Sequence, residues 1–184
     1  MKKKTLERIL TIIKNIASDD EARLHLNGAQ ISYLRENFVL VEATDGHRAV
    51  MIPIEDAGLS RFAKIHGKLC LFPFNVMTSK DVLKRLPDDL TLAEQGSGLA
   101  IRSTHDISIG FLERSERFPN LSATDPKGEV AYEVAFNPKY LLEILKSMQE
   151  DKRQVGLKLR FRDPLGPIEC VLGDGRALLM PMRL

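Results

Sequence analysis

One pattern recurs three times along the chain and limits its fold more than any other feature. An amphipathic helix is followed by three or four strand-like runs joined by tight turns, at about residues 4–54, 68–112 and 130–184. The second and third copies begin with an extra strand, which the first lacks. Such repetition indicates a fold built from one supersecondary unit, used more than once. Because a helix that buries one face needs a sheet beneath it, we expect an α+β fold with helices on one face of curved antiparallel sheets. Two units should pair about a pseudo-twofold axis to form one domain.

Three helices are predicted from apolar residues spaced three and four apart. The first covers residues 2–17, where five basic side chains face one acid and Ile12 interrupts the polar face. The second begins near Thr78 or Ser79 and ends before Pro87. The third begins at Asn137-Pro138, a capping residue followed by a proline at the first helical position.

The remaining periodic runs read as short strands, and two stretches read as loops. Alternation predicts strands at 23–26, 29–34, 38–43, 68–72, 90–93, 99–103, 107–112, 129–136, 155–161, 168–172 and 177–182. Residues 55–67 read as a mixed loop, and a strand over 68–72 should end at Pro73. The polar stretch 114–128 carries Pro119, Pro126 and Gly128, and it is the best domain boundary.

A hairpin in the first copy carries the most chemistry. The strand that ends at Ala43 is followed by the turn dipeptide Asp45-Gly46, and a second strand from Ala49 should stop at Pro53. The tip then presents a hydroxyl, a carboxylate, an imidazole and a guanidinium. Three interpretations stay open: a metal site using Asp45 and His47, a hydrolytic site, or a turn whose polar side chains bind the local backbone. No Gly-x-Ser-x-Gly elbow supports the hydrolytic one.

Composition sets wide limits. Apolar residues make up 43% and charged residues 28% of the chain, as in ordinary globular proteins, and no apolar run approaches the roughly 18 residues of a membrane span. The basic start suits a signal peptide, but Glu7, Arg8 and Lys14 interrupt the apolar stretch that should follow. We therefore expect a cytoplasmic protein in which Cys70 and Cys170 are buried thiols, with no metal and no cofactor. A net charge of +2 does not by itself indicate nucleic-acid binding.

Five motifs in a fixed order resemble the bacterial DNA sliding clamp, the DNA polymerase III beta subunit. They are Ala22–Gly28, Thr44-Asp45-Gly46-His47-Arg48, Phe118-Pro119-Asn120, Phe136–Leu142 and Leu179-Met180-Pro181-Met182-Arg183-Leu184. The resemblance covers nearly the whole chain but not a whole clamp. Residues 1–121 resemble a complete middle domain of two half-domains without its opening strand, 122–128 a linker, and 129–184 the second half of the third domain.

The resemblance implies the DNA-clamp fold and a function without catalysis. Family members close six such domains into a ring with helices inside. The implied function is a processivity factor that oligomerises around duplex DNA, associates with the nucleoid, and binds polymerase or repair proteins through an apolar peptide groove. The alternative is an adaptor or competitor that binds those peptides without encircling DNA. Because a lone half-domain exposes an apolar face and a sheet edge, two chains are expected to pair these halves, giving dimers or tetramers.

The resemblance also implies two sets of site residues. Family members hold duplex DNA without reading its bases, so the basic residues of the helices that line the ring need to contact only phosphates. The expected DNA-facing residues are Lys3, Lys4, Arg8, Lys14, Lys80, Lys84, Arg85, Lys139, Lys146 and Lys152. The expected peptide groove comprises Thr44, Gly46, His47, Arg48, Ala49, Pro119, Asn137, Tyr140, Leu165, Pro167, Leu178, Leu179, Met180, Pro181, Met182 and Arg183. Methionine and leucine would form an adaptable slot. Core packing is the alternative interpretation of Met180 and Met182.

Overall fold

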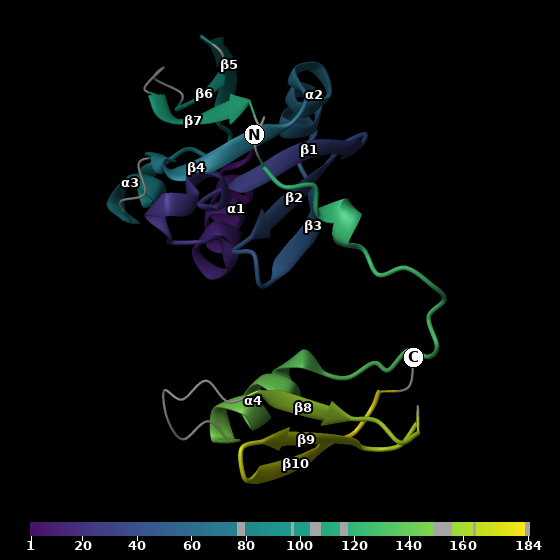
Figure 1. The fold of residues 1–184 in the computed structure, drawn as a ribbon. Helices are drawn as coiled ribbons and strands as arrows, with labels where there is room; N and C mark the ends of the chain where they lie inside the picture. Colours follow the sequence, from purple (N-terminus) through teal and green to yellow (C-terminus); the bar gives the residue numbers. More distant parts are fainter. Residues whose placement is uncertain are drawn as a thin grey trace. The chain divides into compact units, whose positions relative to one another are not determined.

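The chain forms two compact units, Met1–Asp125 and Pro126–Leu184 (Figure 1). The computed structural model describes residues 1–76, 80–96, 98–103, 108–114, 118–148, 156–163 and 165–182. The first unit contains α1 (Lys3–Ile16), η1 (Glu21–Leu26), β1 (Ala29–Arg35), β2 (Phe38–Thr44), β3 (Ala49–Glu55), α2 (Ala57–His66), β4 (Leu69–Val76), α3 (Lys80–Arg85), β5 (Thr91–Gln95), β6 (Gly98–Arg102), β7 (Ser108–Arg114) and η2 (Leu121–Thr124).

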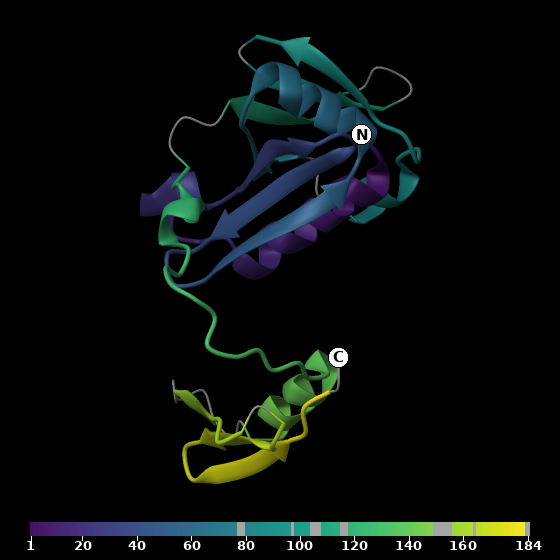
Figure 2. The ribbon, with the colours of Figure 1, turned by 90° about the vertical axis from the view of Figure 1, so that its right-hand side faces the viewer.

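The first unit is built on one antiparallel sheet of seven strands in the order β3-β2-β1-β4-β7-β6-β5. One half supplies β1, β2 and β3, which lie side by side with α1 along them in Figure 2. The other half supplies β4 and the meander from β5 to β7. The halves join where β1 pairs with β4, with Ile31 opposite Leu69. The repeated unit of the sequence is therefore visible twice in one continuous sheet.

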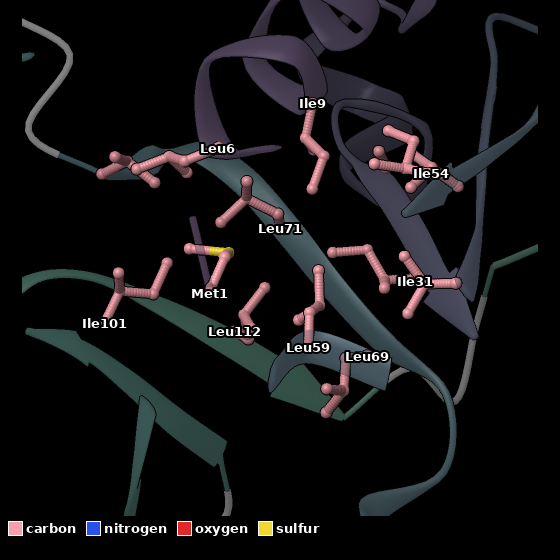
Figure 3. Packing of buried hydrophobic residues seen from close by; sticks show 14 of the residues in the cluster. Met1, Leu6, Ile9, Ile31, Ile54, Leu59, Leu69, Leu71, Ile101 and Leu112 are labelled. Atoms are coloured by element: carbon pink, nitrogen blue, oxygen red, sulfur yellow. The ribbon is translucent and has the colours of Figure 1, made fainter. Parts of the chain in front are cut away.

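A single hydrophobic core covers one face of this sheet. Ile31 and Val41 are cross-strand neighbours, and the same face continues through Leu71 and Leu112. Helix α1 contributes Leu6, Ile9 and Ile13 to this core and α2 contributes Leu59 and Ala63. Figure 3 shows Leu6, Ile9, Leu59 and Leu71 pointing into the same interior, with Met1 among them. Both helices therefore lie on one face of the sheet, and the predicted α+β architecture is confirmed.

The second unit is a smaller copy of the same plan. It contains α4 (Pro138–Met148), β8 (Leu157–Arg160), β9 (Ile168–Leu172) and β10 (Gly175–Leu179), with sheet order β10-β9-β8. Its core consists of Ile168, Cys170 and Leu179 with partly buried neighbours, and no residue of α4 is fully buried. One helix and three strands therefore leave much apolar surface exposed.

Two secondary-structure predictions are wrong. Residues 23–26 belong to the 3₁₀ helix η1 instead of a strand, and residues 57–66 form α2 instead of a loop. Asp56 caps α2, because its Oδ1 accepts a hydrogen bond from Leu59 N at 2.8 Å while its Oδ2 accepts from Lys2 N at 2.7 Å. The cap and the apolar spacing were present in the sequence but were obscured by Gly58 and Gly67.

Two strands continue through prolines that were expected to end them. Pro53 lies inside β3, an edge strand of the sheet, opposite Leu40. Pro73 lies inside β4, where the register with β7 shifts between Leu71 and Val76. Edges and irregular pairings are the places where a missing backbone N–H costs no ladder hydrogen bond.

Smaller differences concern boundaries. Ile12 is buried, so the apolar face of α1 is wider than expected. The predicted strand at 129–136 forms one isolated bridge, between Ala135 and Met182, and the last strand ends at Leu179 rather than Met182. The predicted start of α3 at Thr78 or Ser79 lies outside the described residues. Among the described helices none is long and apolar enough to cross a membrane.

Candidate functional site

The β2–β3 turn is held by its own polar side chains. The Thr44 hydroxyl donates to Arg48 O at 2.7 Å and accepts from Gly46 N at 3.0 Å. Asp45 Oδ1 accepts from the backbone N–H of both His47 and Arg48 at 2.9 Å. Gly46 has a φ of 92°, which glycine adopts without strain. The interpretation of the tip as a turn bound to its own backbone is therefore confirmed for Thr44 and Asp45.

Because Thr44 and Asp45 hydrogen-bond within the turn, the side chains that follow them remain on the surface. Asp45 Oδ2 also accepts from Arg48 Nε at 3.0 Å, and Arg23 Nη1 donates to Asp45 O at 3.3 Å. His47, Arg48 and Ala49 are exposed. The backbone donors of His47 and Arg48, and then the Arg48 guanidinium, lower the pKa of Asp45 to about 2. The carboxylate is thus a structural acceptor, while the imidazole and the guanidinium remain accessible.

We expect this hydrogen bonding to appear as an acid-shifted titration. Because the pKa is lower in the folded state than its ordinary value of 3.8, the stabilisation is complete above that value and is lost as the pH falls through about 2. A carboxyl-carbon NMR titration should give an Asp45 midpoint near 2. A midpoint near 3.8 for Asp45 would contradict the turn geometry.

Pro119, the other predicted groove residue of the first unit, is partly buried and precedes η2. Leu121 within η2 is buried, and the Thr124 hydroxyl donates to Leu121 O at 2.7 Å. The backbone that follows Pro119 is therefore part of the first unit, which extends to Asp125.

The second unit contains the other predicted groove residues that the structure describes. Asn137 caps α4, with its Oδ1 accepting from Lys139 N at 3.0 Å, and Tyr140 is exposed one turn later. Leu165 and Pro167 are exposed before β9, and Pro181 is partly buried. Arg183 lies outside the described residues.

The tail alternates between the core and the surface. Leu179 is 4% exposed and belongs to the core of the second unit, whereas Met180 and Met182 are 64% and 54% exposed. Leu178 is exposed as well, and Met182 N donates to Ala135 O at 2.7 Å. Core packing within the unit therefore accounts for Leu179 but not for the two methionines. Leu179 anchors the tail, which presents a row of flexible apolar side chains.

A hollow lies beside α4. Its volume is about 470 Å³, and its lining includes Tyr140, Ile144, Met148 and Ala177, with Glu143, Ser147 and Arg176 at polar positions. Tyr140 thus belongs to a mainly apolar depression between α4 and β10. Pockets of this composition suit extended peptides with apolar side chains.

The predicted DNA-facing residues divide into free and engaged groups. Lys4, Arg8 and Lys14 are exposed on α1 with Glu7 as the acid nearest in sequence, and Lys84, Arg85 and Lys146 are also exposed. Lys139 is exposed too, but its Nζ forms an ion pair with Glu143 Oε1 at 3.9 Å. Lys3 is engaged, since its Nζ donates to the carbonyl oxygens of Lys84 at 3.1 Å and Leu86 at 3.3 Å. It therefore neutralises the carboxyl end of α3 instead of standing free for phosphates. The side chain of Lys80 and the whole of Lys152 lie outside the described residues.

Sequence reasoning missed a charged cluster on the second unit. Glu169 is buried in β9, and Arg162 Nη2 and Arg176 Nε each donate to it at 2.7 Å, with Arg160 at 3.7 Å. Burial opposes ionisation, but the Arg176 hydrogen bond and the charges of both close arginines outweigh it and lower the pKa of Glu169. Only the register, which places Arg160 opposite Glu169, could have indicated this cluster.

No group of three or more His, Cys, Asp or Glu side chains that could hold a metal ion occurs among the residues with described positions. Cys70 and Cys170 are both buried in strands, and burial raises the pKa of the Cys170 thiol.

Helices on one face of sheets made from a repeated half-domain define the DNA-clamp fold. Solved structures that share it with this chain include DNA polymerase III beta subunits, the bacterial sliding clamps. A C. crescentus beta sliding clamp matches 98% of the chain at a TM-score of 0.73 and 14% identity. The Streptococcus pyogenes beta subunit matches 100% of the chain at a TM-score of 0.69 and 20% identity. The Pseudomonas aeruginosa beta subunit matches 98% of the chain at a TM-score of 0.69 and 13% identity.

The chain spans about half the length of these clamps, namely 49%, 49% and 50% of the C. crescentus, S. pyogenes and P. aeruginosa chains. The chain therefore has the DNA-clamp fold over about half the length of these clamps. No protein-family model and no curated protein matches the sequence.

Proposed function

We propose that this protein is a reduced sliding clamp, an accessory factor that oligomerises around duplex DNA and tethers a polymerase or repair protein. The observation that carries the proposal is the fold match to sliding clamps over 97–100% of the chain. In this proposal residues 1–121 act as a complete clamp-type domain, 122–128 as the connection, and 129–184 as a half-domain. The activity is processivity, not catalysis.

The partner surface that we propose is the apolar peptide groove. Its candidates from the first unit are the exposed His47, Arg48 and Ala49 and the partly buried Pro119. Its candidates from the second unit are Tyr140, the exposed methionines and the neighbouring leucines. Methionine side chains adapt to different apolar partners, while His47 and Arg48 can bind a peptide backbone. The occupant would be a short peptide of a polymerase or repair protein with apolar side chains.

The proposed DNA contact is electrostatic and independent of base sequence. Lys4, Arg8 and Lys14 give α1 a positive exposed face with one intervening acid, whereas Lys139 and Lys146 on α4 flank Glu143. Few phosphate contacts mean weak direct affinity and a modest salt dependence. Stable retention therefore requires that the duplex be enclosed.

Enclosure predicts that DNA topology decides retention. The protein, with a clamp loader where loading requires one, should elute with nicked circular plasmid in about 150 mM salt and should be released when the plasmid is linearised. Reversing Lys4, Arg8 and Lys14 to glutamate should weaken retention, whereas reversing Arg61, Lys64 and Lys68 provides the charge-matched control. Equal retention on circular and linear DNA, or none on either, would exclude the reduced clamp.

The alternative function is an adaptor or competitor that binds the same peptides without enclosing DNA. The engagement of Lys3, which removes one cation from the proposed DNA contact, favours it. Peptide binding together with no topological retention would identify this second function.

A further inference from the structure

The first unit closes through two equivalent junctions. At one of them β4, the segment before α3, pairs with β1, the first strand after α1, and Ala29 lies opposite Leu71. At the other, the segment before α1 pairs with the residues that enter β5, the first strand after α3. There Lys2 bridges to Asp89, while Met1 and Leu90 exchange hydrogen bonds at 2.7 and 2.9 Å. In each half, the segment before the helix (the leading segment) thus pairs with the first strand after the helix of the other half.

The second unit contains only one segment of each kind that pairs at these junctions: one leading segment before its helix, and one first strand after it. Its leading segment is 129–136 and its first strand after the helix is β8. Within the described residues 118–148, 156–163 and 165–182, the leading segment forms a single bridge, to Met182, and β8 pairs only with β9. Val130 and Tyr132 are 72% and 51% exposed, and Leu159 and Phe161 are partly exposed. Tyr132 contacts Phe161 edge-on, but this contact covers neither ring.

The two unpaired segments match each other in pattern and charge. Val130, Tyr132 and Val134 alternate with Glu129 and Glu133, so one face of the leading segment is apolar and the opposite face carries the acids. In β8, Leu157 and Leu159 alternate with Lys158 and Arg160. An antiparallel pair that aligns the apolar faces can place Glu133 opposite Lys158, and Arg160 then lies opposite Ala131, diagonal to both acids. Opposite charges in such direct and diagonal positions stabilise a strand pair. Pairing β8 with β8 would place bases beside bases, and pairing 129–136 with itself would place acids beside acids.

We propose that a second copy of this chain completes the second unit: the 129–136 segment of each copy pairs with β8 of the other, about a twofold axis. The two junctions repeat those that close the first unit, and they cover the exposed Val130, Tyr132, Leu159 and Phe161. This specifies the self-association within the proposed function, on which it rests.

Charge reversal with mixing tests this pairing. The wild-type chain should sediment at twice its 20.7 kDa at micromolar concentration. Glu129→Lys with Glu133→Lys, and separately Lys158→Glu with Arg160→Gln, should each weaken the dimer by about tenfold or more, because both junctions then lose their charge pairs. An equimolar mixture of the two variants should recover the dimer, since acids and bases then meet at both junctions.

Two controls accompany this test. Asp19→Lys with Asp174→Lys makes the same change of charge at exposed sites outside both segments and should leave the dimer intact. Circular dichroism checks folding, and Glu169 keeps its two 2.7 Å arginine partners when Arg160 is replaced. A monomeric wild type, a dimer that both variants preserve, or a mixture that does not recover would each overturn the pairing. A charge-dependent dimer without topological DNA retention would instead overturn the reduced clamp alone.

Discussion

Replacing Met180 and Met182 together with aspartate should abolish binding of clamp-type peptides while leaving the fold intact. Both side chains are more than half exposed, so two carboxylates are tolerated in the unbound protein. In a peptide-filled apolar groove the same carboxylates would be buried without partners, which is strongly unfavourable. We expect a loss of affinity of more than about 100-fold by fluorescence anisotropy with a labelled peptide, equivalent to roughly 3 kcal/mol.

The control variant carries the same charge change on exposed apolar residues outside the groove. Ile65→Asp with Phe74→Asp replaces side chains that are 70% and 69% exposed, in the first unit. It should bind peptide as the wild type does. Undiminished peptide binding by the methionine variant would remove the tail from the proposed groove, whatever the control does.

Truncating Leu71 to alanine should produce the largest loss of stability. Leu71 is fully buried and lies opposite both Ala29 of β1 and Leu112 of β7, at the centre of the seven-stranded sheet. Removing its branched end leaves a cavity that two strands and the helices line, and such changes cost about 2–5 kcal/mol. Urea denaturation followed by circular dichroism should show the transition of the first unit at lower denaturant, with an unchanged slope.

Ile65→Ala provides the comparison for this stability change. Its side chain is on α2 and mostly exposed, so the free energy of unfolding should change by less than about 0.5 kcal/mol. Equal effects of the two substitutions would contradict the packing of Leu71 at the centre of the core.

The sequence predicted the parts of this structure that local rules decide. The β2–β3 hairpin follows from strict alternation before Asp45-Gly46, and α1 and α4 follow from their apolar spacing and, for α4, its Asn137-Pro138 start. The five-motif resemblance predicted the clamp fold, which is confirmed. The prediction that the hairpin and the tail form one groove goes beyond local rules, and it remains a prediction.

What local rules could not predict depends on partners that are distant in sequence. Proline is tolerated in β3 only because that strand is at an edge, and edge position is a property of the whole sheet. The Lys3 ammonium group is held by hydrogen bonds to carbonyl oxygens that are more than 80 residues away in the sequence. Glu169 is ionised in a buried position because the strand register brings arginines to it. The missed helix α2 is different, since its cap at Asp56 was readable.

The seam between β1 and β4 has a consequence for how the protein can be dissected. Because the first 125 residues share one sheet and one core, a fragment cut between β3 and β4 would leave each piece with half a hydrophobic interior, and neither should fold alone. Truncation libraries and interaction fragments should therefore respect the boundary between Asp125 and Pro126. Amide protons throughout that larger body should exchange with solvent in one cooperative step, including those of strands that belong to different copies of the repeated unit.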